Sequence, residues 1–102
     1  MRVGVPREIK ANEHRVGLTP MAVREYAARG HAVSVETGAG AGAGFTDDDY
    51  RRAGADIAPD AEAAFAGAEM IVKVKEPQKA EWERLRRDQI LFAYLHLAPD
   101  PE

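Results

Sequence analysis

The sequence predicts a doubly wound α/β fold, in which a mostly parallel sheet carries helices on both faces. Short apolar segments rich in β-branched residues alternate with helical segments of about ten residues along the 102-residue chain. This alternation is typical of right-handed βαβ units, which build parallel sheets covered by helices. The length suits one domain or part of a larger one.

The elements of the first part follow from local signals. Pro6 closes a first β-branched strand, and a polar loop leads from it to Thr19-Pro20. Pro20 is favoured at the first position of a helix and keeps Thr19 out of the helical region, as an N-cap requires. Gly30 suits the left-handed backbone that ends a helix. We therefore expect a strand at 2–5, a helix at 20–29 and a strand at 32–36.

The alternation resumes after a run of glycine and alanine at 38–44. Three Asp residues that follow Thr46 suit the positive end of a helix. Pro77 closes the strongest of the later strands. The expected elements are a short helix ending near Gly54, a strand at 56–58, an Ala-rich helix at 60–66, a strand at 70–75, a polar helix at 79–87 and an apolar strand at 89–95.

Composition excludes several classes of function. The chain has 14 basic and 17 acidic residues and no cluster of Lys or Arg, so nucleic acid is not an expected partner. It has no Cys, which excludes disulfides and Cys-ligated zinc and fits a reducing compartment, and no metal site is assigned. The charged N-terminus is unlike a signal peptide, and no apolar run approaches the roughly 20 residues that span a bilayer. We expect a soluble, cytoplasmic protein without a membrane partner.

Three polar residues stand at or after the ends of predicted strands. Arg15 lies in the loop after the first strand, Lys75 is the last residue of the fourth, and His96 directly follows the fifth. Ligands of open parallel sheets bind beyond the carboxyl ends of the strands. The three side chains are therefore candidates for one shared crevice.

Each candidate also has a simpler interpretation. Alternation in the fourth strand puts Lys73 and Lys75 on one face, as in an edge strand with solvated lysines. Arg15 fits a surface charge in a polar loop. His96 lies between two leucines, as do many partly buried histidines that have no catalytic role. The pattern alone leaves these alternatives open.

The glycine-rich run invites a comparison with dinucleotide-binding loops. Gly38, Gly40 and Ala43 match the form G-x-G-x-x-A between a strand and a helix. That fingerprint requires a helix that opens inside the motif, whereas Thr46 and Asp47 place the helix start after the run. We favour a flexible loop that permits close approach of a partner domain or a substrate.

A family resemblance adds to these observations. Residues 4–20, Gly-Val-Pro-Arg-Glu-Ile-Lys-Ala-Asn-Glu-His-Arg-Val-Gly-Leu-Thr-Pro, resemble the N-terminal signature shared by alanine dehydrogenases and the α subunit of proton-pumping nicotinamide nucleotide transhydrogenases. Residues 38–45, 71–77 and 91–99 resemble alanine dehydrogenase in order and spacing, so the likeness covers essentially the whole chain. Transhydrogenases lack a His at the position of His96, so the dehydrogenase is favoured.

The resemblance implies NAD-dependent oxidative deamination of L-alanine to pyruvate and ammonia, and its reverse. It implies that His96 is the catalytic acid/base and that Arg15 and Lys75 bind the substrate carboxylate and carbonyl oxygen. These roles suit the side chains, because Arg presents two parallel donors, Lys a compact charge, and His a pKa near neutrality.

Alanine dehydrogenases are several times longer than this chain. The resemblance therefore implies that residues 1–102 are an incomplete N-terminal substrate-binding domain, Rossmann-like or flavodoxin-like, and that NAD is bound by a Rossmann domain absent from them. No cofactor-binding residue is assigned here, and we expect these residues alone to be inactive. The full-length protein is expected to be a homo-oligomer, a hexamer in the family. A transhydrogenase α subunit and a stand-alone small-ligand module remain alternatives.

Overall fold

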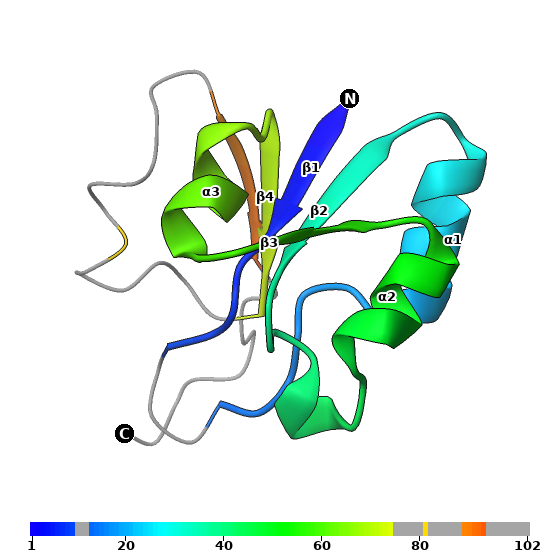
Figure 1. Ribbon diagram of the computed structural model, residues 1–102. Helices are drawn as coiled ribbons and strands as arrows, with labels where there is room; N and C mark the ends of the chain where they lie inside the picture. Colours follow the sequence, from blue (N-terminus) through cyan, green and yellow to red (C-terminus); the bar gives the residue numbers. More distant parts are fainter. Residues whose placement is uncertain (10–12, 75–80, 82–88, 94–102) are drawn as a thin grey trace, which may run out of the picture.

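A computed structural model of the chain describes residues 1–9, 13–74, 81 and 89–93 (Figure 1). Five parallel strands form one sheet in the order β3-β2-β1-β4-β5. The strands are β1 (Arg2–Val5), β2 (Ala32–Glu36), β3 (Asp56–Ala58), β4 (Met70–Lys73) and β5 (Ile90–Ala93). The helices are α1 (Pro20–Ala28), α2 (Asp47–Ala53) and α3 (Ala61–Ala66), with a 3-10 turn η1 at Ala41–Ala43. The predicted fold class is confirmed.

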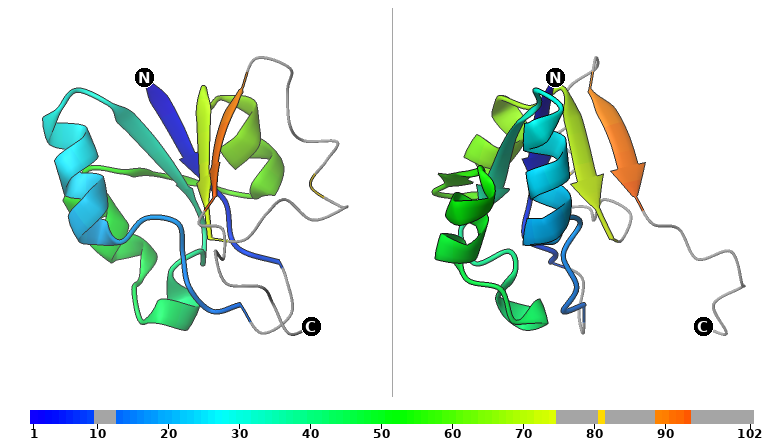
Figure 2. Two further views of the ribbon diagram at one scale, coloured as in Figure 1. Left: turned by 180° about the vertical axis from the view of Figure 1, so that it is seen from behind. Right: turned by 90° about the vertical axis from the view of Figure 1, so that its right-hand side faces the viewer.

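The helices cover both faces of the sheet (Figures 1 and 2). Helices α1 and α2 pack beside each other against β2 and β3, whereas α3 packs on the opposite face against β1 and β2. The chain first builds outward from β1 to β2 and β3, and then returns through α3 to β4 on the other side of β1. Strand order therefore reverses between β1 and β4, the position at which open α/β sheets bind ligands.

The predicted capping signals are present at the helix ends. The Thr19 hydroxyl accepts a hydrogen bond from the Ala22 N–H, and Pro20 is the first residue of α1. Thr46 and Asp49 form a capping box at the start of α2. Gly54 ends α2 with a φ of 109°, a backbone angle that suits glycine. Local sequence therefore determines where these two helices begin.

Most element bounds agree with the prediction, and the differences lie near the end of the chain. The strand predicted at 70–75 ends at Lys73, and the strand predicted at 89–95 is described from Ile90 to Ala93. Apart from Glu81, the helix predicted at 79–87 lies outside the described residues.

Two hydrophobic clusters match the two faces of the sheet. The larger cluster lies under α1 and α2, and the smaller one lies under α3. The members of the smaller cluster are Phe65, Ala68 and Ile71. The larger cluster includes the valines of β1 and β2, Val23, Val72 and the fully buried Tyr50. Burial on both faces explains why these strands are almost continuously apolar.

No helix within the described ranges has both the length and the apolar composition needed to cross a bilayer.

Candidate functional site

The candidate site lies where β1 and β4 separate, at their carboxyl ends. Their ladder pairs Val3 with Met70 and Gly4 with Ile71. Pro6, which has no N–H to donate, follows the last residue of β1. Beyond the ladder, the Glu8 side chain from the loop after β1 bonds to residues at the end of β4.

A buried cluster of three charges lies at this point. The Lys73 Nζ donates to Glu8 Oε1 and to Glu81 Oε2, each over 3.0 Å, and all three side chains are at most 2% exposed. The second oxygen of Glu8 accepts the Val74 N–H at 2.9 Å. Burial of two carboxylates and one ammonium is costly unless each group is paired and hydrogen-bonded.

The structure corrects the interpretation of Lys73 as a solvated residue of an edge strand. Strand β4 lies between β1 and β5, and Lys73 is fully buried. Alternation favours one solvated face, but parallel strands are commonly buried on both faces. A charged residue in such a strand needs a buried partner, and Glu8 supplies it from the loop after β1. Glu8 is a site residue that the sequence-based prediction does not include, since no local signal distinguishes it.

Arg15 is held in a fixed orientation by a neighbour in its own loop. Its Nε donates to Glu13 Oε2 at 2.9 Å and its Nη2 to Glu13 Oε1 at 3.1 Å. The Glu13 side chain is only 5% exposed, whereas that of Arg15 is 61% exposed. The hydrogen bond to Glu13 and its negative charge raise the pKa of Arg15 above its usual value. Arg15 is therefore a cation that is paired with a nearly buried carboxylate through one edge of its guanidinium and is otherwise exposed.

A small cavity joins Arg15 to the buried cluster. Its volume is about 210 Å³, well above the roughly 10–15 Å³ that one water needs. It lies between the loop after β1 and the glycine-rich loop. The lining residues are Arg7, Glu8, Glu13, His14, Arg15, Gly38, Ala39, Ala41 and Gly42. The cavity is thus bordered by the Arg15–Glu13 ion pair and by the Glu8 carboxylate of the buried cluster, and it has room for a small polar ligand.

Two glycines allow the Arg15 loop to pack closely on its surroundings. A Cβ on Gly17 would lie 2.4 Å from the Val72 carbonyl oxygen of β4. A Cβ on Gly42 would lie 2.8 Å from the His14 carbonyl oxygen. Both neighbours are backbone atoms and cannot turn away, so any side chain at these positions would displace the loop.

Tyr50 secures the far end of the same loop. Its hydroxyl donates to the Leu18 carbonyl oxygen at 2.8 Å, and its side chain is fully buried. Burial, with a smaller contribution from the charge of Asp49, raises the pKa of Tyr50 to about 12. The hydroxyl therefore remains a hydrogen-bond donor at physiological pH.

The glycine-rich run does not provide a phosphate-binding loop in the described structure. The Gly38 N–H donates to Asp47 at 3.0 Å, and the Thr37 hydroxyl donates to the same carboxylate at 2.6 Å. These two bonds, the hydroxyl first, lower the pKa of Asp47. The Asp47 carboxylate thus accepts the two hydrogen bonds that Gly38 and Thr37 could otherwise give to a phosphate. The three Asp residues in the first turn of α2 would also repel a phosphate. Gly42 of this run lies against the His14 backbone in the Arg15 loop, and close approach of a partner domain or a substrate stays a prediction.

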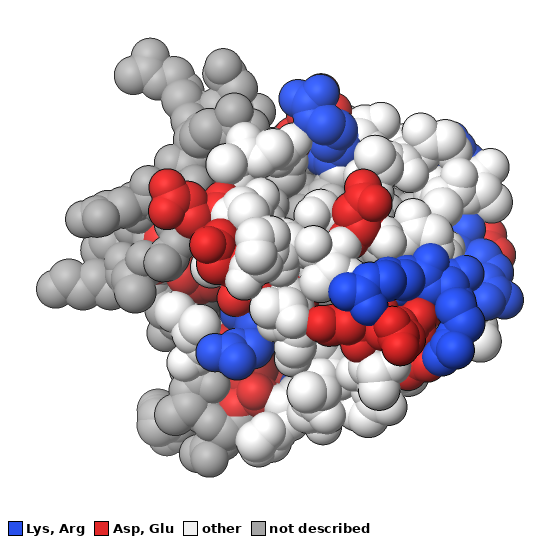
Figure 3. All heavy atoms as spheres, in the orientation of Figure 1, with Lys and Arg blue, Asp and Glu red and all other residues white. Residues whose placement is uncertain are grey.

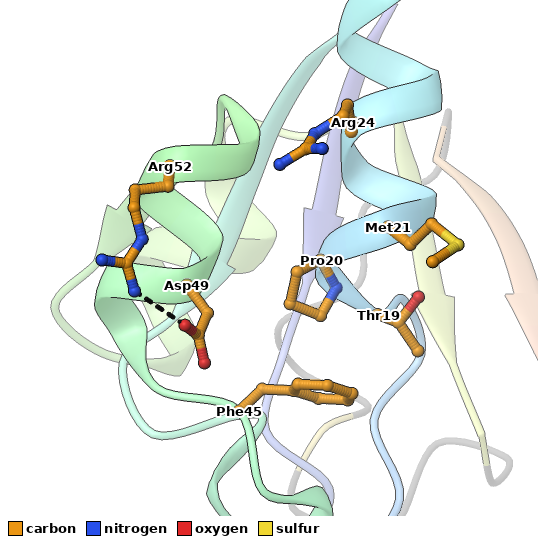
Figure 4. A pocket seen from close by; sticks show the side chains of 7 residues that line it. All are labelled: Thr19, Pro20, Met21, Arg24, Phe45, Asp49 and Arg52. Atoms are coloured by element: carbon orange, nitrogen blue, oxygen red, sulfur yellow. Dashed lines mark hydrogen bonds and ion pairs between the residues drawn. The ribbon is translucent and has the colours of Figure 1, made fainter.

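A larger cavity of about 670 Å³ lies between α1 and α2 (Figure 4). Its lining is mostly apolar, and the Arg52 guanidinium at its rim is paired with Asp49 at 2.9 Å. Figure 3 shows basic and acidic side chains next to one another over α2, where Arg51 also pairs with Asp48. Because its described lining includes no buried charge and no residue of the β1–β4 switch point, this cavity is the weaker candidate for a polar substrate.

The other two predicted site residues, Lys75 and His96, lie outside the described residues. Their roles stay predictions, although Lys75 follows Val74, whose N–H is held by Glu8. In the part of the chain that the structure describes, no three His, Asp or Glu side chains group to hold a metal ion.

Comparison with known proteins identifies the family. Residues 4–102 match the model of the alanine dehydrogenase/PNT N-terminal domain. The chain is 53% identical over all of its 102 residues to an alanine dehydrogenase of Methanococcus maripaludis and 51% identical to that of Bacillus subtilis. It spans 27% of the length of each of these curated relatives.

Solved structures give the same assignment. An L-alanine dehydrogenase superposes with a TM-score of 0.90 at 55% identity, covering 95% of this chain and 27% of its own. A transhydrogenase from Sinorhizobium meliloti superposes with a TM-score of 0.86 at 30% identity, covering 93% and 28%. The chain therefore belongs to the alanine dehydrogenase/PNT N-terminal domain family.

Proposed function

We propose that this chain is the substrate-binding part of an NAD-dependent L-alanine dehydrogenase. The reaction converts L-alanine, NAD⁺ and water to pyruvate, ammonium, NADH and a proton, and runs in both directions. The observation that carries the proposal is Arg15, a cationic fork held by Glu13 beside a small cavity between the loops that follow β1 and β2. The 51–55% identity to alanine dehydrogenases supports this activity over others.

The substrate carboxylate would bind to the second edge of the Arg15 guanidinium. Arginine has five N–H donors arranged as two usable edges. Glu13 occupies the edge formed by Nε and Nη2, which leaves the N–H groups of Nη1 and the outer N–H of Nη2 for a ligand. Because Glu13 is itself buried, the substrate would meet a donor pair that needs little reorganisation.

Lys75 and His96 would complete the site. An ammonium at Lys75 would polarise the pyruvate carbonyl oxygen. The imidazole of His96 would give a proton to, and take one from, the hydroxyl oxygen of the carbinolamine between iminopyruvate and pyruvate. The nicotinamide cofactor, when bound, accepts or supplies the hydride, and the proposal assigns its binding to a Rossmann domain outside residues 1–102.

The rest of the proposal concerns the whole protein. Residues 1–102 would form an incomplete domain that is completed by further chain, as the coverage of the relatives suggests. The complete enzyme would be a cytoplasmic homo-oligomer, a hexamer by family resemblance. The absence of Cys is compatible with a reducing compartment.

An assay of both directions of the reaction tests the function. We expect the complete protein to consume NADH when given pyruvate and ammonium, and the isolated 102-residue chain to show no turnover. Hydride exchange between two nicotinamide nucleotides without alanine or pyruvate would instead indicate the transhydrogenase. The 30% identity to a transhydrogenase structure, against 55% to an alanine dehydrogenase, favours the first outcome.

A further inference from the structure

We propose that Glu8 is a positioning residue for substrate binding, because its carboxylate fixes the backbone at Val74 and so the start of the segment that carries Lys75. This inference rests on the proposed function and adds a residue to its site. The proposed role belongs to a side chain that is almost completely buried.

The contacts of Glu8 connect the chain after β1 to the end of β4, beyond the point where the backbone pairing of the two strands stops. Backbone pairing between the two strands stops at Gly4 and Ile71. Three residues after β1, the Glu8 carboxylate accepts both the Val74 N–H and the Lys73 ammonium. One side chain thus holds consecutive residues at the end of β4, where the two strands separate and a crevice is expected.

Glu8 also borders the cavity that Arg15 lines. The two residues line the same cavity, and Glu8 belongs to the same loop region as Arg15. Gly17 packs this loop directly on the backbone of Val72 and Lys73. The loop and the end of β4 are therefore joined twice, by the packing of Gly17 and by the Glu8 carboxylate.

Glu81 provides a matched control within the same cluster. It lies as close to the Lys73 ammonium as Glu8 does, at 3.0 Å, and its side chain is equally buried. Removing either carboxylate leaves Lys73 with one buried counter-charge. Glu8 in addition accepts the Val74 N–H, the contact that the proposal concerns.

The test compares Glu8→Ala with Glu81→Ala in the complete enzyme, measuring the KM for pyruvate, kcat and the thermal unfolding midpoint. We expect Glu8→Ala to raise the KM for pyruvate about tenfold or more, since small misplacements of binding groups have large effects. Glu81→Ala should leave this KM within about twofold, although both variants lose stability. Loss of folded protein lowers the apparent kcat without changing KM, so a purely structural role would not give this pattern.

Glu8→Asp serves where the alanine variant does not fold. It keeps the charge beside Lys73 but shortens the reach to Val74, so it should also raise the KM for pyruvate. Equal KM values in the Glu8 and Glu81 variants, or a wild-type KM in Glu8→Asp, would overturn the positioning role alone. A wild-type enzyme without turnover of pyruvate would instead overturn the proposed function.

Discussion

Gly17→Ala is the most informative substitution in the Arg15 loop. The added Cβ would lie 2.4 Å from the Val72 carbonyl oxygen, where ordinary contact begins at 3.4 Å, so the loop must move by about 1 Å. The obstacle is backbone in the interior of the sheet and has no rotamer to change. Overpacking of this kind costs typically 1–3 kcal/mol. A misplacement of about 1 Å in a binding group can cost roughly 100-fold in catalytic efficiency.

The assay is kcat/KM for pyruvate in the complete enzyme, with far-UV circular dichroism to confirm folding. Gly67→Ala is the matched control, because a Cβ at Gly67 meets nothing within 4 Å and its φ of −91° suits alanine. We expect a loss of about 100-fold for Gly17→Ala and less than about twofold for Gly67→Ala. A folded Gly17→Ala enzyme with wild-type efficiency would refute the claim that this contact positions Arg15.

Three further predictions concern stability. Tyr50→Phe leaves the Leu18 carbonyl without its donor and should cost about 1–3 kcal/mol in urea unfolding, and an unchanged midpoint would contradict this. Lys73→Met removes the ammonium that contacts two buried carboxylates and should cost about 3–5 kcal/mol; a variant as stable as the wild type would show that these contacts do not stabilise the fold. The Thr37 hydroxyl helps to hold the pKa of Asp47 below its usual range, so this carboxylate stabilises the fold above the ordinary Asp pKa of about 4. That contribution is lost as pH falls through the lower folded pKa, and Thr37→Val should reduce it. Identical acid unfolding profiles for Thr37→Val and wild type would argue against the effect.

Local signals are sufficient to predict most of the fold. Pro6 and the Thr19-Pro20 pair mark boundaries by their own backbone restrictions, and these are independent of distant contacts. The helix start at Thr46 follows the glycine-rich run as predicted, which argues against a dinucleotide loop. Alternation, spacing and helix caps depend on residues that are close together in the sequence. They can therefore be recognised in a single sequence without the structure.

The site can be predicted only in part. Arg15 is a candidate from its place after the first strand, and its cavity supports that choice. The pairing of Lys73 with Glu8 joins residues 65 positions apart, and no local pattern distinguishes such a lysine from a solvated one. The roles of Gly17 and Gly42 depend on backbone approach between separate loops, which only the tertiary structure shows.

A crystal structure of the complete protein with bound pyruvate tests the central claim most directly. We predict pyruvate beyond the carboxyl ends of β1 and β4, with its carboxylate on the free edge of Arg15 and with Lys75 and His96 in contact with it. Pyruvate bound in the groove between α1 and α2, or side chains of Arg15, Lys75 and His96 too far apart to touch one three-carbon acid, would contradict it.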